Sequence, residues 1–142
     1  MRPQSCKAKG RRLQQKIVAD ILEAFPHLKP DDALSTSMGC GGEDVRLSPV
    51  ARNVIPLSIE AKNQEKLNVW EAYNQAVANC PEAATPCVVF KKNNTDTFAM
   101  ISWKTLLSLY VQLSKKTTSG KTKRIKELVS ELSILMDQPE EI

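Results

Sequence analysis

The sequence of 142 residues lacks closely paired cysteines, has a single histidine and contains no long apolar run. It contains one histidine, His27, and four cysteines, none of them in a C-x-x-C pair. This composition argues against a structural zinc site and against a Ser-His or Cys-His hydrolase. No run of about 18 apolar residues is present, and the basic N-terminus is not followed by the apolar segment of a signal peptide. We therefore expect a cytosolic protein with reduced thiols.

Basic and acidic residues are unevenly distributed along the chain. The net charge is +4, from 20 basic and 16 acidic residues. Residues 1–16 and 115–126 each hold six basic residues and no acidic one, whereas residues 17–114 hold 8 basic and 11 acidic residues. Two acid-free basic runs are typical of a protein that neutralises nucleic-acid phosphates. Of the first run we expect DNA contacts from Lys9, Arg11, Arg12 and Lys16.

Hydrophobic spacing predicts an α/β fold. Apolar residues three and four positions apart predict helices over about 10–25, 65–79, 103–113 and 125–135. Apolar alternation or continuity predicts strands over 57–62, 87–90 and 97–101, with short extended segments at 34–37 and 44–47 and a turn at 49–53. The order strand, helix, strand implies one parallel pair within a mixed sheet. The last two strands are predicted to form a hairpin with Lys91 and Lys92 at its tip, where we expect both lysines to contact DNA phosphates.

The chain is predicted to divide near residue 115. Residues 115–121 are polar and rich in Lys, Thr and Ser, which favours a linker. We therefore expect a domain over 1–114 that begins with a basic arm, followed by a basic linker and an amphipathic helix within 115–142. The apolar stripe of that last helix either packs on its own domain or pairs with a second copy.

Two carboxylates and a lysine are predicted to meet on neighbouring strands. Asp44 opens one extended segment, and Glu60 and Lys62 alternate with apolar residues in the next strand. If the segments pair, Asp44 and Glu60 face each other roughly 5 Å apart, a geometry that suits Mg²⁺. Such an ion activates water, and Lys62 would orient that water or stabilise the developing charge, as phosphodiester hydrolysis requires. The alternative is a solvated strand face with a surface Glu60–Lys62 pair worth under about 1 kcal/mol.

A wider set of residues resembles a known enzyme superfamily. The set comprises Ser35-Thr36-Ser37, the glycine-rich segment 39–44, Ile59-Glu60-Ala61-Lys62 and the helix that carries Gln75. It resembles the PD-(D/E)-x-K nucleases, most closely the Holliday junction resolvases of archaea and resolvase-like nucleases of bacteriophages. The resemblance covers about residues 10–110. It implies a restriction-endonuclease-like mixed sheet flanked by helices, dependence on Mg²⁺ or Mn²⁺, cleavage of branched DNA and a homodimer.

The resemblance also implies roles for individual residues. Asp44 and Glu60 would be metal ligands, with the carbonyl of Ala61 completing the shell, and Lys62 would be the catalytic lysine. Ser35 or Ser37 would contact the DNA backbone or the active site, and the amide of Gln75 would reach the water or a phosphate.

Two positions depart from the family pattern. Glu43 stands where the motif has proline, and Gln15 stands where archaeal resolvases have a metal-binding glutamate on the first helix. The number of metal ions is therefore left open.

We thus expect a Mg²⁺-dependent junction-resolving endonuclease in the cytoplasm of a prokaryotic cell or a phage-infected host. Two alternatives stay open. One is a nicking or repair nuclease that acts on flaps or ordinary duplex, and the other is a DNA-binding or assembly protein that does not cut.

Overall fold

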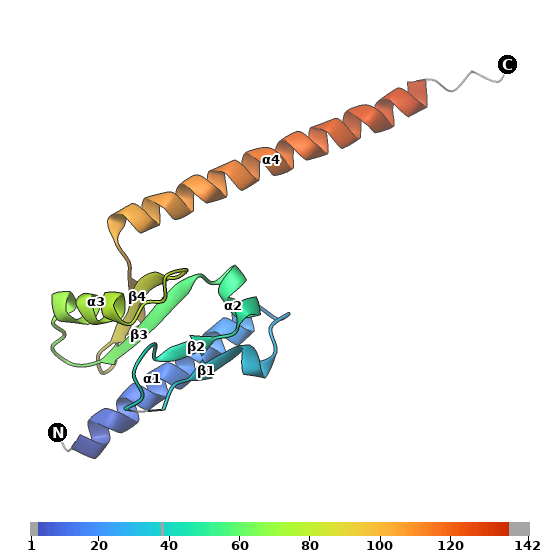
Figure 1. The fold of residues 1–142 in the computed structure, drawn as a ribbon. Coiled ribbons are helices and arrows are strands. Elements are labelled where there is room, and N and C mark those ends of the chain that lie inside the picture. Colours follow the sequence, from blue (N-terminus) through green and yellow to red (C-terminus); the bar gives the residue numbers. More distant parts are fainter. Residues whose placement is uncertain (1–2, 38, 137–142) are drawn as a thin grey trace. The chain divides into compact units, whose positions relative to one another are not determined.

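The computed structural model, which describes residues 3–37 and 39–136, contains a five-stranded mixed sheet flanked by helices (Figure 1). Across the sheet lie β1 (Ala33–Ser35), β2 (Val45–Leu47), β3 (Leu57–Asn63), β4 (Thr85–Lys91) and β5 (Phe98–Met100) in that order. β3 and β4 are parallel, and the other neighbouring pairs are antiparallel. The predicted mixed sheet, its parallel pair and its final hairpin are confirmed.

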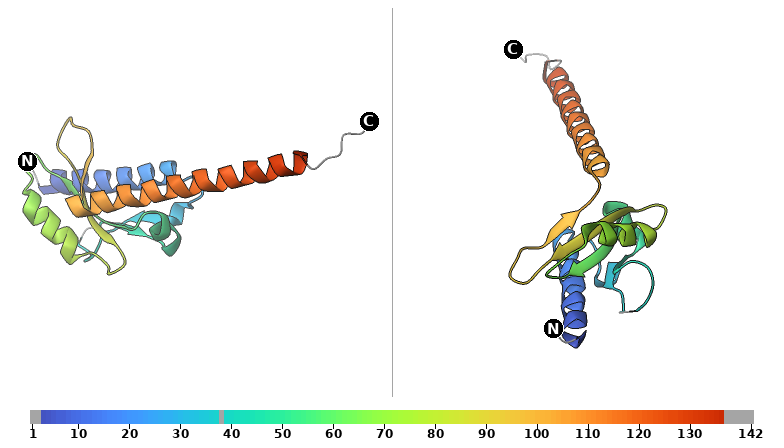
Figure 2. Two further views of the ribbon diagram at one scale, coloured as in Figure 1. Left: turned by 90° about the horizontal axis from the view of Figure 1, so that it is seen from above. Right: turned by 90° about the vertical axis from the view of Figure 1, so that its left-hand side faces the viewer.

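Helices α1 (Pro3–Ala24) and α3 (Val69–Ala78) cover opposite faces of the sheet (Figure 2). Successive side chains of a strand point to opposite faces, and neighbouring residues of β4 accordingly join different cores. Val89 packs against the core that α1 shares with β1, β2 and β3. Val88 packs instead against Ala72 and Ala76 of α3.

The first helix is longer than its apolar pattern predicts. Its buried side is made by Leu13, Ile17 and Ile21, at the spacing of one helix face. The helix nevertheless begins at Pro3, because the alanine, glutamine and lysine residues before position 10 are good helix formers. The described basic residues of the predicted N-terminal arm therefore lie on α1.

A short helix lies where a turn was predicted. The segment predicted as a turn at 49–53 is α2 (Pro49–Val54). Ser48 caps it by accepting a hydrogen bond from the Ala51 N–H at 3.2 Å, and proline suits the first helical position because its missing N–H is not needed there. A single 3₁₀ turn, Pro30–Asp32, precedes β1.

The C-terminal part of the chain is one helix, α4 (Trp103–Met136). The prediction of a linker at 115–121 is wrong, because this segment contains no proline and its lysines favour a helix. The side chains of Thr117, Thr118 and Thr122 each donate a hydrogen bond to the carbonyl four residues earlier. The two compact units of the chain are Met1–Ile101 and Ser102–Ile142. None of the helices described is long and apolar enough to cross a membrane.

Candidate functional site

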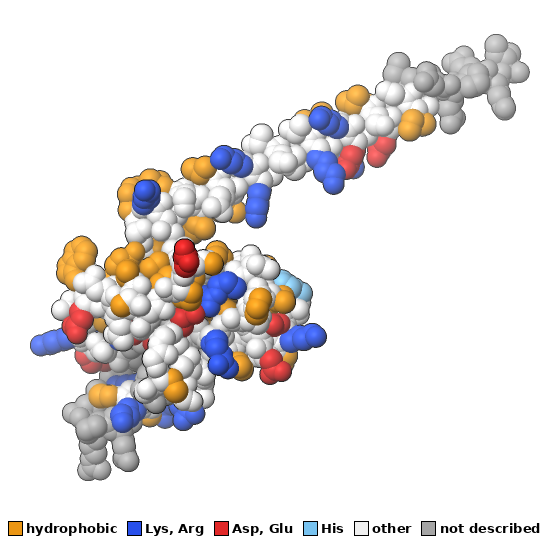
Figure 3. All heavy atoms as spheres, viewed as in Figure 1, with side chains coloured by type: hydrophobic (Ala, Val, Ile, Leu, Met, Phe, Trp, Pro, Cys, Tyr) orange, Lys and Arg blue, Asp and Glu red, His pale blue; other side chains and the backbone are white. Residues whose placement is uncertain are grey.

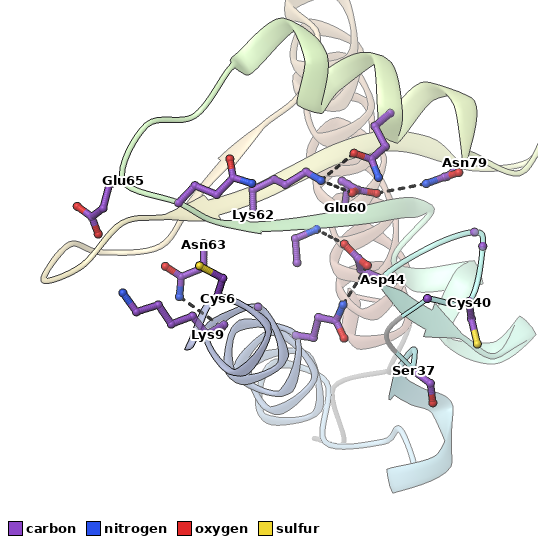
Figure 4. Close-up of a pocket in the computed structure, with 18 of the residues that line it drawn as sticks. Cys6, Lys9, Ser37, Cys40, Asp44, Glu60, Lys62, Asn63, Glu65 and Asn79 are labelled. Atoms are coloured by element: carbon purple, nitrogen blue, oxygen red, sulfur yellow. Dashed lines mark hydrogen bonds and ion pairs between the residues drawn. The ribbon is translucent and has the colours of Figure 1, made fainter. Parts of the chain in front are cut away.

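An open cleft of about 850 Å³ lies where β2 and β3 separate (Figure 4). β2 pairs with β3 only through Val45 and Ile59, next to a hydrogen bond of 3.0 Å from the Asp44 N–H to the Ile59 carbonyl. β3 then continues to Asn63 beside β4 alone. Its freed edge, α1, α3 and the loop around Gly41 line the cleft. The divergence of two strands therefore creates the space in which the candidate residues meet.

Asp44 is fixed by four hydrogen bonds at the mouth of this divergence. Its Oδ1 accepts from the Gln14 amide at 2.9 Å, and its Oδ2 accepts from the Ala61 N–H at 2.7 Å. Its backbone N–H donates to Ile59, and its carbonyl accepts from the Thr36 N–H at 2.9 Å. The carboxylate thus occupies the position where a continued β2 would have paired with β3.

The loop that leads to Asp44 is tied to α2. Arg52 donates two hydrogen bonds to the Glu43 carboxylate, at 2.9 and 2.7 Å, and a third to the Leu57 carbonyl at 2.6 Å. Such bidentate pairs have fixed geometry. Gly42 has φ of 101°, a left-handed conformation that favours glycine. Glu43 therefore anchors the loop at the position where the family motif has proline.

Glu60 and Lys62 project from β3 toward α3. Glu60 is 3% exposed, and its carboxylate lies 2.8 Å from the Lys62 ammonium. Lys62 also donates to Gln75 Oε1 at 2.8 Å, and Asn79 lies 3.4 Å from Glu60. A buried carboxylate requires such partners, because an unpaired buried charge is strongly destabilising.

The surroundings of Asp44 shift its pKa in opposing directions. Burial raises the pKa of Asp44 above its usual value of 3.8, and the charge of Glu60 raises it further. The Ala61 N–H, the Lys62 ammonium and the Gln14 amide oppose that rise in pKa. Perturbed carboxyls in clefts are characteristic of functional sites, and a cation near Asp44 would relieve the cost of its ionisation.

The available ligands fit a hard, oxygen-binding ion. Besides the carboxylates of Asp44 and Glu60, the cleft receives Gln14, whose side chain is 4% exposed and whose Oε1 has no hydrogen-bond partner. Within residues 3–37 and 39–136, no group of three or more His, Cys, Asp or Glu residues is placed to hold a metal. Mg²⁺ needs only one or two carboxylates because it keeps several waters, so two carboxylates and one amide oxygen suffice.

The glutamine at this site is Gln14, whereas the sequence pointed to Gln15. Gln15 is exposed and does not line the cleft. One residue turns a helix by about 100°, and Gln14 lies three residues before Ile17, on the buried side of α1. The three-residue spacing between Gln14 and Ile17 is the sequence signal that could have identified Gln14. Asn79 was also missed, although it lies four residues after Gln75 and therefore on the same side of α3.

The other predicted catalytic and metal-binding residues are brought together. Asp44, Glu60, Ala61, Lys62 and Gln75 all line the cleft. Gln75 is exposed, and the hydrogen bond from Lys62 is what holds its side chain toward the site.

Most of the predicted DNA contacts lie beside the cleft. A second hollow runs between α1 and the β4–β5 turn, and no acidic residue lines it. It shares Lys9 and Asn63 with the cleft, and Lys9 donates to Asn93 Oδ1 at 2.7 Å. We call this hollow the basic groove; its cationic residues are Lys9, Arg12, Lys16 and Lys91.

The remaining predicted contacts are placed less favourably. Arg11 and Lys92 are exposed and line neither hollow. Ser37 lines the cleft, while Ser35 is exposed and lines only a smaller depression that adjoins Ser37.

Comparison of the chain with protein-family models, with curated proteins and with solved structures found no match.

Proposed function

We propose that this protein is a divalent-metal-dependent, structure-selective DNA endonuclease with a restriction-endonuclease-like fold, and that it acts as a Holliday junction resolvase. The observation that carries the proposal is the meeting of Asp44, Glu60 and Lys62 in one open cleft. A solvated strand face would leave these groups in water. Here Glu60 is buried and Asp44 is held by α1 and β3.

Asp44, Glu60 and the Gln14 Oε1 would hold Mg²⁺ or Mn²⁺. When bound, such an ion lowers the pKa of a water and offsets charge on a phosphate oxygen. The Gln14 amide and the Ala61 N–H favour the ionised form of Asp44, which is the form that binds a cation. Two hydrogen-bonded oxygens also fix the direction of the carboxylate before substrate arrives.

Lys62 would stabilise the negative charge that develops on the phosphate during hydrolysis. Its ammonium is held between Glu60 and Gln75. Gln75 therefore acts as a positioning residue for Lys62 in this proposal, and Asn79 does the same for Glu60.

The basic groove would bind the DNA backbone beside the scissile phosphate. It is continuous with the cleft through Lys9 and Asn63. Neutralisation of phosphates by lysine and arginine supplies much of the affinity for DNA and makes it salt-dependent. Symmetric cleavage of a four-way junction requires two such sites, which a homodimer would provide.

Substitution of the site residues tests the cleavage chemistry. Asp44→Asn and Lys62→Ala should each lower cleavage of a synthetic four-way junction in Mg²⁺ by at least about 100-fold, while junction binding stays within a few-fold. Asp31→Asn and Lys29→Ala are matched controls, because both residues are exposed and lie outside the cleft and the groove. Unchanged cutting by either site variant would overturn the assignment.

Substrate choice is tested separately by one panel of DNA structures. Four-way junctions, flaps, duplex and single strands should be compared under one Mg²⁺ and salt condition, with junctions cut fastest. Equal cleavage of all four would remove the resolvase assignment, and a preference for flaps or duplex would favour a repair or nicking nuclease. Binding without cutting in both Mg²⁺ and Mn²⁺ would favour the non-cleaving alternative.

A further inference from the structure

The middle of α4 carries a cationic face of its own. Three lysines and four hydroxyl residues line a shallow hollow along the helix: Ser114, Lys115, Thr118, Ser119, Thr122, Lys123 and Lys126. A turn of about 100° per residue places the three lysines within about 80° of one another. We call Lys115, Lys123 and Lys126 the lysine face. Figure 3 shows lysine and arginine side chains along the middle of α4, with hydrophobic side chains toward both ends.

Apolar packing does not explain this part of the helix. Residues 114–124 include no hydrophobic side chain, and all of them are exposed. A helix that lies on a membrane needs an apolar side opposite its basic one, and a coiled coil needs an apolar seam. Neither can be built from residues 114–124, although the ends of α4 carry exposed leucines and valines.

The segment also has no counter-charge of its own. Residues 115–126 hold six basic residues and no acidic one, and the one ion pair of α4 among the described residues joins Arg124 to Glu127 at 3.4 Å. Like charges on neighbouring turns destabilise a helix. A polyanion is the class of partner that removes this repulsion.

The shape of the hollow suits a phosphate backbone. Thr118 and Thr122 direct their hydroxyl groups to main-chain carbonyls at 3.0 Å, so these short side chains stay close to the helix and leave room between the lysines. Lys115 and Lys126 are about 16 Å apart along the axis. Duplex DNA carries one negative charge per about 1.7 Å of its axis, so the lysine face spans several phosphates.

We propose that the lysine face of α4 is a DNA-backbone binding surface distinct from the cleft and the basic groove. It belongs to the second compact unit of the chain, whereas the cleft and groove belong to the first. The choice of DNA as the polyanion rests on the proposed function. The contacts proposed are of lysine ammonium groups with phosphates, which carry no sequence information, so the surface would read charge and not sequence.

The test compares two triple variants of the full chain, each of which removes three positive charges from α4. K115Q/K123Q/K126Q removes the lysine face, and K116Q/K121Q/R124Q removes charges that are spread around the rest of the helix. Glutamine keeps the helix propensity of lysine, which circular dichroism of the free variants verifies. Binding of a four-way junction and of duplex DNA is measured in EDTA across a range of KCl concentrations.

The lysine-face variant should lower the slope of log affinity against log salt by about 2.7, at about 0.9 per lost phosphate contact. Its affinity should fall at least tenfold, and the control variant should change the slope by less than half as much. Equal effects of the two triples, or no effect of either, would overturn the proposal. So would a loss of binding to phosphatidylserine vesicles that exceeds the loss of DNA binding.

Cleavage assays separate this proposal from the proposed function. If the unmodified chain cuts no DNA but the lysine-face variant still loses DNA affinity, only the endonuclease assignment fails. If Lys62→Ala abolishes cutting while the lysine-face variant binds like the unmodified chain, only the α4 surface fails.

Discussion

Helices α1 and α4 each carry an acid-free basic run, but they differ in what surrounds it. α1 carries five of the six basic residues of 1–16, and α4 carries all six of 115–126. On α1, Leu13, Ile17 and Ile21 are at most 9% exposed and pack on the sheet. On α4, no described residue is buried. The charges of α1 are therefore held in place by a core, whereas those of α4 are held by their own helix alone.

This difference shows that a basic run specifies charge but not position. The apolar spacing around the run decides whether its side chains are aimed at a particular place. On α1 that spacing directs Lys9 and Arg12 to the groove and Gln14 to Asp44. On α4 the apolar residues lie toward both ends of the helix, so its charged middle gains no fixed direction from packing.

The largest expected effect comes from leucine truncation on the two helices. Leu13→Ala should lower the free energy of unfolding by about 2–5 kcal/mol, because Leu13 is buried in the core. Leu132→Ala, at a residue that is 59% exposed, should change it by less than about 0.5 kcal/mol. Urea denaturation followed by circular dichroism measures both. An equal cost at Leu132 would mean that α4 is packed against a partner, and the contrast would be lost.

A divalent ion should also separate the two helices. Mg²⁺ at 100 times its Kd should raise the free energy of unfolding of the first unit by about 2.7 kcal/mol. Asp44→Asn should remove this gain, because it removes one of the two carboxylates. The helix signal of α4 should not respond. Urea denaturation in EDTA and in Mg²⁺ gives the values, and an equal Mg²⁺ gain in the Asn variant would contradict the site.

The pH dependence of that gain follows from the raised pKa of Asp44. A carboxyl with a raised pKa is protonated more readily in the folded chain, so its contribution to stability is present below pH 3.8 and is lost as pH rises through the folded pKa. Without metal, Asp44→Asn should therefore be more stable than the unmodified chain at neutral pH, and the difference should vanish in acid. Because protons and metal compete for Asp44, the Mg²⁺ gain should shrink as pH falls through that pKa.

A smaller effect, on Mg²⁺ affinity, is expected when two adjacent glutamines of α1 are each replaced by leucine. Gln14→Leu removes the donor to Asp44 and the free Oε1, and should weaken Mg²⁺ binding by about tenfold, or about 1.4 kcal/mol. Gln15→Leu, on the exposed side, should leave it unchanged. Titration calorimetry with the full chain measures both affinities. Equal effects would mean that α1 acts through helix stability and not through the direction in which Gln14 points.

The sequence predicted most of the sheet and the central residues of the site. Strand alternation placed Glu60 and Lys62 on one face, an inference that depends on a period of two enforced by backbone geometry. Asp44 reaches the same cleft, but not as the predicted cross-strand partner of Glu60. β2 pairs with β3 only at Val45 and Ile59, and the Asp44 carboxylate accepts from the Ala61 N–H and from Gln14. The position of Gln14 was not predicted, because the resemblance pointed one residue further along and a helix converts that shift into about 100° of rotation.

The errors in secondary structure have a common cause. The predicted turn that forms α2 contains a serine cap and a proline at the first helical position, and the predicted linker that continues α4 contains lysines and threonines. In both cases the polar composition predicts a break in structure that the folded chain does not have. The side chains of Ser48 and Thr118 instead form hydrogen bonds with backbone groups of the helices. The spacing of apolar residues contains no information about such hydrogen bonds.

The smallest expected effect concerns the basic groove, where two contacts are removed. Arg12→Gln/Lys91→Gln should lower the salt slope of DNA binding by about 1.8, whereas Lys29→Gln/Lys104→Gln, at exposed residues outside both hollows, should leave it nearly unchanged. Binding titrations across KCl concentrations give the slopes. Effects of distant, independent sites add, so combining this variant with the lysine-face variant should give the sum of the two slope changes. A combined change smaller than the sum would mean that α1 and α4 do not contact the same DNA molecule at once, and their similar basic runs would then serve separate binding events.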